Sequence, residues 1–303
     1  MKDSGRNKKK KRSQAPITVL VVLFTFLVVF STVMLVKETI PYVESRKEYE
    51  DLQQFILPAE PEIKPSAVIA EDSEQTVEEY LPVDNSEVQQ ESGTQGGISE
   101  ETVQDEMDME DGICPLKVDF EALWEVNPDI KGWIYLEALD ISYPVVQGKT
   151  NEDYIYTSVK GTANNGGSIF MDCRNNDKFT DPHTVIYGHN MKNGSMFGKL
   201  KKLYSQKFVD EWDAPLNFWI ITPEESYRYD IFSIHTVLAA GETYTLFAEG
   251  SSSVAEYINA MVRQTGVKLP QRVYSNTDKI ITLSTCTSGD EYRLVVQGVL
   301  HVE

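Results

Sequence analysis

An uninterrupted apolar stretch near the N-terminus constrains this chain more than any other feature. From Ser13 to Val36 no residue carries a charge, and residues 16–36 (PITVLVVLFTFLVVFSTVMLV) are mostly aliphatic or aromatic. A helix of about 20 such residues crosses the ~30 Å hydrocarbon core of a bilayer. The stretch therefore predicts a transmembrane helix over residues 16–36. A cleaved signal peptide is the alternative, but its apolar region has about 7–15 residues and ends at a small-residue cleavage site.

Basic residues directly precede the predicted helix. Residues 1–12 hold seven Lys and Arg against a single acid, Asp3. The positive-inside rule then makes residues 1–15 a cytoplasmic tail and places the chain after the helix outside the cell. We expect a single-pass protein of the cell membrane with an extracellular functional domain. Residues 37–56 carry apolar side chains at three- to four-residue spacing, which predicts a juxtamembrane helix.

The formal net charge of -19, from 28 Lys and Arg against 47 Asp and Glu, is concentrated in one segment. Residues 57–112 contain seventeen Asp and Glu, one Lys, and few large apolar side chains. Such a composition cannot bury enough apolar surface to offset the entropy of ordering. We therefore expect residues 57–115 to be a disordered acidic linker that spaces the domain from the membrane. A negative chain also argues against nucleic acid as a partner, because phosphate binding needs cationic surface.

The composition becomes globular in residues 116–303, with short β-branched and aromatic runs separated by Gly, Asn and Asp. Strands are predicted over residues 132–136, 143–147, 168–171, 184–187, 219–222, 227–237, 279–285 and 292–301. Helical segments are predicted over 120–125, 197–203 and 253–265. This pattern predicts a mainly β fold, a closed antiparallel eight-stranded barrel with a few peripheral helices.

The three cysteines cannot all pair with one another, so an exported domain keeps at least one free thiol. Cys286 ends an apolar strand and is followed by a short polar loop and another strand, which predicts a hairpin with Cys286 opposite Arg293. Alternation places Ser284 on the same face. A guanidinium beside sulfur favours the thiolate and can donate to an oxyanion. Cys173 is expected to be a small buried apolar residue, whereas Cys114 is open to either a free thiol or an intermolecular bridge.

The four histidines and the cysteines form no HExxH or CxxC motif, so we expect neither a metal site nor a cofactor. His189 ends a predicted strand, where catalytic groups are often displayed, and is the candidate acid and base. The other three are expected elsewhere: His183 and His301 at the surface, and His235 packed within a strand. His189, Cys286 and Arg293 together are a set suited to nucleophilic acyl transfer.

The motifs GWIYL, YPVVQGKTNEDY, GSIFMDCRN, HTVIYGHNMKNGSMFGKL and TLSTC, in that order, closely resemble class B sortases, the membrane-anchored cysteine transpeptidases of Gram-positive bacteria. The resemblance covers residues 118–302. It implies a sortase-type barrel in which His189, Cys286 and Arg293 match the catalytic residues of the family. The peptide-contact positions of the family fall on Asn151, Ile155, Tyr187 and Ser284.

The resemblance also implies a reaction. A sortase cysteine transpeptidase cleaves the C-terminal sorting signal of a secreted protein at Thr-Gly or Thr-Xaa through a thioacyl intermediate. It then transfers the Thr carboxyl to an amine of a cell-wall precursor or of a pilin Lys. Relatives accept NPxTx-like or PPxTG-like signals, which leaves open both the signal and the choice between wall anchoring and pilus assembly.

Two other functions compete with this interpretation. An L,D-transpeptidase also uses Cys and His, but its Arg follows the Cys within about two residues, whereas six residues separate Cys286 from Arg293 here. A membrane-tethered extracellular binding module would keep Cys286 for structural reasons alone. The six-residue loop also looks shorter than in many sortases, and the acidic linker is unlike the short connection expected of the family.

Overall fold

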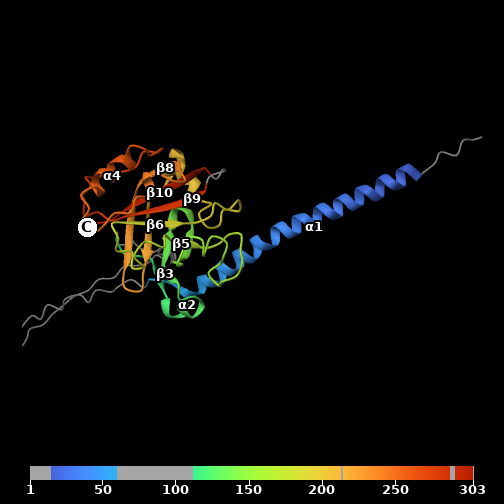
Figure 1. Cartoon of the computed structure of the whole chain (residues 1–303), viewed down its shortest axis with the longest axis horizontal. Helices are drawn as coiled ribbons and strands as arrows, with labels where there is room; N and C mark the ends of the chain where they lie inside the picture. Colours follow the sequence, from blue (N-terminus) through green and yellow to red (C-terminus); the bar gives the residue numbers. More distant parts are fainter. Residues whose placement is uncertain (1–14, 60–111, 213, 287–290, 303) are drawn as a thin grey trace, which may run out of the picture. The chain divides into compact units, whose positions relative to one another are not determined.

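A computed structural model of the chain describes residues 15–59, 112–212, 214–286 and 291–302 (Figure 1). The first element is one continuous helix, α1 (Ala15–Leu52), which includes both the predicted transmembrane helix and most of the juxtamembrane helix. Its Val19–Val36 part is long and apolar enough to cross a membrane, and its side chains are exposed. At the other end of α1, Tyr49 and Leu52 are buried in the core of the folded domain.

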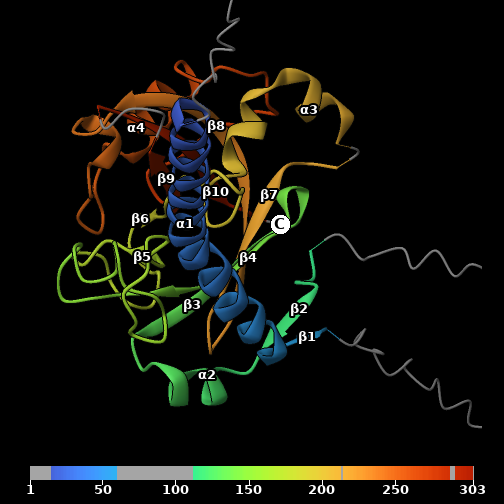
Figure 2. The same cartoon turned by 90° about the vertical axis from the view of Figure 1, so that its right-hand side faces the viewer.

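Two short strands that lie far apart in the sequence pair with each other beside the end of α1. After the turn η1 (Gln53–Phe55), β1 (Ile56–Pro58) pairs antiparallel with β2 (Leu116–Val118) (Figure 2). The Ala59 amide donates to the Pro115 carbonyl over 2.9 Å, so the acidic segment leaves and rejoins the domain at one place. The expectation that this segment spaces the domain from the membrane helix is therefore wrong. Residues 57 and 58 belong to a strand, and residues 60–111 of the expected linker lie outside the described residues.

A closed barrel forms the centre of the domain, as the sequence predicts. Its described strands run in the order β10, β8, β7, β3, β4, β5, β6, β9. Their bounds are β3 (Ile130–Leu136), β4 (Ile141–Val146), β5 (Ile169–Met171), β6 (His183–Tyr187), β7 (Asn217–Ile221), β8 (Ser226–Leu238), β9 (Ile280–Cys286) and β10 (Tyr292–Leu300). All eight predicted strands are confirmed. The barrel is mixed rather than antiparallel, because β4 with β5 and β6 with β9 are parallel pairs.

Helices are few and peripheral. The predicted segments correspond to α2 (Phe120–Val126), the turn η3 (Leu200–Tyr204) and α4 (Val254–Val262). Asp119 caps α2 by accepting from the Ala122 amide at 3.0 Å. The sequence patterns missed α3 (Gln206–Glu211) and the turns η2 (Glu137–Leu139) and η4 (Glu242–Tyr244).

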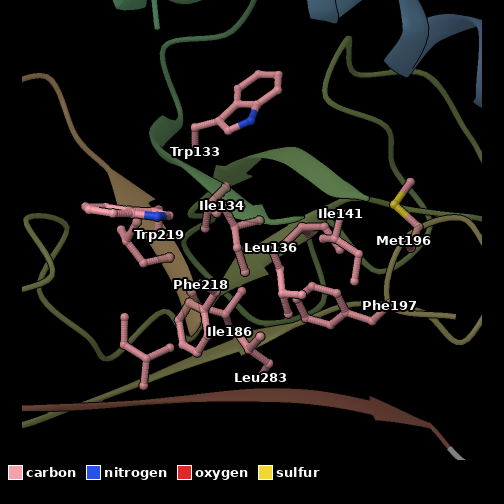
Figure 3. Close-up of a cluster of buried hydrophobic side chains, with 14 of the residues drawn as sticks. Trp133, Ile134, Leu136, Ile141, Ile186, Met196, Phe197, Phe218, Trp219 and Leu283 are labelled. Atoms are coloured by element: carbon pink, nitrogen blue, oxygen red, sulfur yellow. The ribbon is translucent and has the colours of Figure 1, made fainter. Parts of the chain in front are cut away.

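The interior of the barrel orients the strands that carry the candidate site. Figure 3 shows Ile134, Phe197 and Phe218 packed around Ile186 of β6 and Leu283 of β9, whereas Trp133 lies on the other side of β3. Burying each such side chain contributes roughly 1.5–3 kcal/mol. Because neighbouring residues of a strand point to opposite faces, inward Ile186 and Leu283 turn the residues that follow them, Tyr187 and Ser284, outward.

His183 is buried, contrary to the expectation of a surface position. It begins β6, its Nδ1 lies 2.7 Å from the Thr245 carbonyl, and its Nε2 lies 2.8 Å from the Thr282 hydroxyl. A carbonyl only accepts, so Nδ1 donates and Nε2 accepts from Thr282. Burial lowers the pKa of His183 to about 4. His235 is buried within β8 as expected, and His301 is partly exposed beside Asp230.

Candidate active site

A pocket of about 740 Å³ opens where β6 and β9 end. The four predicted peptide-contact residues line it, together with two of the three predicted catalytic residues: Asn151, Ile155, Tyr187, Ser284, His189 and Arg293. The third, Cys286, lies beside lining residues Ser284 and Thr285 at the end of β9. Residues far apart in the sequence thus meet in one pocket.

Strand pairing brings the three predicted catalytic residues to one place. The parallel strands β6 and β9 pair in register, with Tyr187 beside Ser284, so His189 and Cys286 each follow two residues later. The antiparallel strand β10 sets Arg293 opposite Cys286, which confirms the predicted hairpin register. Residues directly opposite in such a pair share a face and have Cβ atoms about 5 Å apart. The side chain of Cys286 lies outside the described part of the structure.

The other two cysteines are half-buried free thiols outside this strand end. The Cys114 thiol lies 3.4 Å from the Leu116 carbonyl, and burial raises its pKa, which disfavours the nucleophilic thiolate. Cys173 donates its backbone amide to the Asn151 side chain at 2.7 Å. Neither thiol lines the pocket that contains His189 and Arg293.

His189 is held on two sides. Its Nε2 lies 2.7 Å from the Ile155 carbonyl, and its ring stacks on Tyr156 with centroids 5.4 Å apart. The carbonyl accepts, so Nε2 carries a proton and Nδ1 is the nitrogen left to exchange one. The preceding residue is Gly188, and a Cβ at this position would lie 2.4 Å from the Ile169 side chain. The absence of a side chain therefore lets the backbone before His189 run close to the core.

Arg293 lines the pocket from β10 with a partly buried side chain. Its Nη1 donates to the Tyr292 carbonyl at 3.1 Å. In general, a cation near a thiol favours the thiolate, and a guanidinium can stabilise an oxyanion.

Asp172, which the sequence interpretation missed, connects three pocket-lining residues from the end of β5. This fully buried carboxylate accepts from Arg174 Nε and Nη2, each at 2.8 Å, and from Asn151 Nδ2 and the Tyr187 hydroxyl, each at 3.0 Å. Burial opposes its ionisation, but these hydrogen bonds outweigh burial and hold the pKa of Asp172 well below its usual range. Burial and this negative charge raise the pKa of Tyr187, so Tyr187 stays a donor. A polar residue directly after a predicted strand was the available signal.

Tyr244 also lines the pocket and was also missed. Its hydroxyl lies 2.9 Å from the Ser284 hydroxyl, and its ring stacks on Tyr187 with centroids 6.3 Å apart. Aromatic walls with a few polar groups are typical of sites that bind extended or small ligands. Within the described ranges, no three His, Cys, Asp or Glu side chains form a group that could hold a metal ion.

Comparisons with known proteins agree with this geometry. The family model of the sortase domain matches residues 134–301. Sortase B of Listeria monocytogenes is 36% identical over 182 residues, which cover 59% of this chain and 72% of that protein. The structure of the Staphylococcus aureus sortase B–substrate complex is 29% identical with a TM-score of 0.55, and the match covers 60% of this chain and 84% of that one.

A third similar structure is a Streptococcus pyogenes class B sortase involved in pilus biogenesis. It is 28% identical with a TM-score of 0.53, and the match covers 61% of this chain and 98% of that one. The sortase family model spans more than half of this chain, and the similar proteins are sortases of one class. The chain therefore belongs to the sortase family, in class B.

Proposed function

We propose that this sortase transpeptidase acts through Cys286, His189 and Arg293, by cleaving a C-terminal sorting signal after Thr and joining the Thr carboxyl to an amine. The supporting observation is the strand register. Arg293 lies opposite Cys286, and His189 and Cys286 each lie two residues after the paired residues Tyr187 and Ser284. Three unlike groups with complementary chemistry then border one pocket.

The first half-reaction forms the thioacyl enzyme. The Cys286 thiolate attacks the Thr carbonyl carbon, and the carbonyl oxygen becomes an oxyanion that Arg293 stabilises by donating hydrogen bonds. When the intermediate collapses, the peptide C–N bond breaks and a C–S bond remains. His189 gives its Nδ1 proton to the departing amine, so the C-terminal tail leaves as a neutral amine.

The second half-reaction reverses these roles. The incoming amine attacks the thioester carbonyl, His189 takes its proton, and the Cys286 thiolate leaves. Attack by water instead of an amine would give the endopeptidase outcome. For the acceptor we propose a peptidoglycan-precursor amine or a pilin Lys. Solved relatives include a sortase B complexed with triglycine and the S. pyogenes enzyme involved in pilus biogenesis.

Peptide binding is assigned to the pocket walls. Asn151 and Tyr187 are held in place by Asp172, and Ser284 by Tyr244. Groups fixed in this way bind a peptide without a further ordering cost. We propose that they and Ile155 contact the sorting signal, of NPxTx-like or PPxTG-like sequence.

The proposed topology puts this pocket outside the cell. The Val19–Val36 part of α1 is the candidate span, and the basic residues before it favour a cytoplasmic N-terminus. An enzyme anchored this way meets secreted substrates as they leave the membrane.

Product analysis tests the proposal. The full chain in detergent is incubated with peptides of both signal types and with triglycine, and the products are identified by mass spectrometry. We expect a product in which the N-terminal peptide fragment is joined through Thr to triglycine. His189→Ala should lower its rate of formation by about two to four orders of magnitude while the circular dichroism spectrum is unchanged.

A binding module would give a different result. Wild type and Cys286→Ala would then both retain the peptides, and neither would produce a cleaved or transferred fragment. Wild-type rates in His189→Ala would remove His189 from the proposed role.

A further inference from the structure

We infer that the last turns of α1 position His189, by holding the loop of residues 154–168 (the 154–168 loop) against the barrel. The inference rests on the proposed role of His189 as acid and base. It makes the helix that carries the membrane span part of the support of the active site, rather than only an anchor.

The first step is the contact between α1 and the loop. Glu48 on α1 accepts from the Lys160 amide at 3.0 Å and from the Thr162 hydroxyl at 3.4 Å. The Lys160 ammonium also lies 3.4 Å from Asp51, one helical turn further on. These contacts hold the tip of the loop to the helix.

Tyr49 makes the deepest of these contacts. Its ring is buried and packs edge-on against Tyr143 with centroids 5.4 Å apart. Its hydroxyl donates to the Gly167 carbonyl at 2.6 Å and lies 3.3 Å from the Ser168 hydroxyl. The helix is thus fixed to the end of the loop as well as to its tip.

Gly167, which accepts from Tyr49, also packs closely against Ile155 at the start of the loop. Its φ of +54° is left-handed, and a Cβ there would stand 2.1 Å from the Ile155 carbonyl oxygen. The next residue, Ser168, donates its amide to the Tyr154 carbonyl at 3.0 Å. The two ends of the loop therefore lie in direct contact, and a shift of Gly167 displaces Ile155.

Ile155 and Tyr156 are the residues that hold the His189 ring. The same Ile155 carbonyl that faces Gly167 accepts from His189 Nε2 at 2.7 Å, and the Tyr156 ring stacks on the imidazole. This hydrogen bond determines which nitrogen is free for proton exchange and where it points. Small displacements of a catalytic group lower the rate steeply, so support from α1 has a kinetic consequence.

Two variants of α1 test the inference in the full chain in detergent micelles. Tyr49→Phe removes the hydroxyl and keeps the ring, and Glu48→Ala removes both contacts to the loop, whereas Glu48→Gln keeps an acceptor oxygen. Glu50→Ala is the matched control, because Glu50 pairs with Arg46 on the same helix at 2.6 Å. None of these residues is in the proposed catalytic set.

The readout is the NMR spectrum of protein labelled at histidine, in which the four His rings are assigned by single substitution. We expect the His189 ring resonances to shift in Tyr49→Phe and Glu48→Ala, less in Glu48→Gln, and not in Glu50→Ala. The transpeptidation kcat should fall roughly tenfold in Glu48→Ala.

Unchanged His189 resonances in both test variants, or an equal shift in Glu50→Ala, would overturn the inference. The spectral result does not need activity, so the two proposals fail separately. An inactive wild type with a shifted His189 in Glu48→Ala would reject the proposed function and retain the positioning by α1.

Discussion

Replacing Asp172 by Asn should destabilise the domain and loosen the pocket at the same time. Asp172 is fully buried, and its Oδ2 receives Arg174 Nη2, Asn151 Nδ2 and the Tyr187 hydroxyl, while its Oδ1 receives the Nε and amide of Arg174. Asn has one acceptor oxygen and an amide nitrogen that only donates, so this nitrogen must replace either Oδ1 or Oδ2 and face the donors bound there. At least two hydrogen bonds are lost in either orientation.

The magnitude follows from those bonds. A hydrogen bond to a charged acceptor contributes about 1.5–3 kcal/mol. The Arg174 side chain is 60% exposed, so water can replace part of its pairing, and its contribution is discounted. We therefore expect Asp172→Asn to lower the free energy of unfolding by about 2–4 kcal/mol.

Urea unfolding of the full chain in a nonionic detergent, followed by Trp fluorescence, measures this difference. Buried Trp133 and Trp219 report on the barrel. The matched control is Asp140→Asn, since Asp140 is exposed and pairs with Lys199 at 2.8 Å. A loss below about 1 kcal/mol, or one no larger than the control, would refute the reasoning.

The pH dependence of the difference has a definite sign. The folded pKa of Asp172 lies below its ordinary value of 3.8, so the unfolded chain takes up a proton at higher pH than the folded chain. The contribution of Asp172 is therefore complete at about pH 5–7 and declines as the pH falls below about 4. Wild type and Asp172→Asn should become more alike in stability under acidic conditions. A difference that grows on acidification would contradict this assignment.

Three further predictions concern other residues. Gly188→Ala should lower the stability by about 1–3 kcal/mol, because its Cβ would stand 2.4 Å from Ile169 and 2.7 Å from Phe197, and a wild-type urea midpoint would count against this. Burial lowers the pKa of His183 to about 4, so wild type should lose stability as the pH falls from about 6.5 toward 4, by up to roughly 1.4 kcal/mol per unit. His183→Gln should show a weaker dependence in the same urea series, and an equal slope would contradict the assignment. Arg293→Lys should reduce kcat/KM by about tenfold or more, because the point charge of Lys cannot replace the planar fork of donors of Arg. Steady-state rates within about twofold of wild type would remove Arg293 from the proposed role.

Local pattern was enough to predict most of the barrel. Alternation and turn residues located all eight strands, and the short loop after Cys286 determined the register that puts Arg293 opposite it. Both features depend on neighbours in the sequence. The parallel pairs β4–β5 and β6–β9 join strands separated by long excursions, and periodicity carries no information about which distant strands meet.

Long-range contacts also explain what the sequence patterns missed. The pairing of β1 with β2 spans the acidic segment, whose composition suggested a spacer and gave no sign that its ends meet. Asp172 looks like an ordinary acid in the sequence, and its role depends on donors from two other segments, Asn151 and Tyr187, that join the local donor Arg174. His183 follows an Asp-Pro pair that is typical of turns, but β6 begins at His183. The ring is buried and hydrogen-bonded to Thr245 and Thr282, which lie far away in the sequence.

The central claim, that Cys286 is the nucleophile of a sortase reaction, is tested most directly by intact-mass spectrometry of the full chain. The protein is mixed with each sorting-signal peptide in the absence of an amine, quenched in acid and digested to locate any adduct. We predict a mass increase equal to the peptide fragment ending in Thr less one water, as a thioester requires, located on Cys286 and absent from Cys286→Ala. The absence of an adduct with every peptide, or an adduct on Cys114 or Cys173 instead, would contradict the claim.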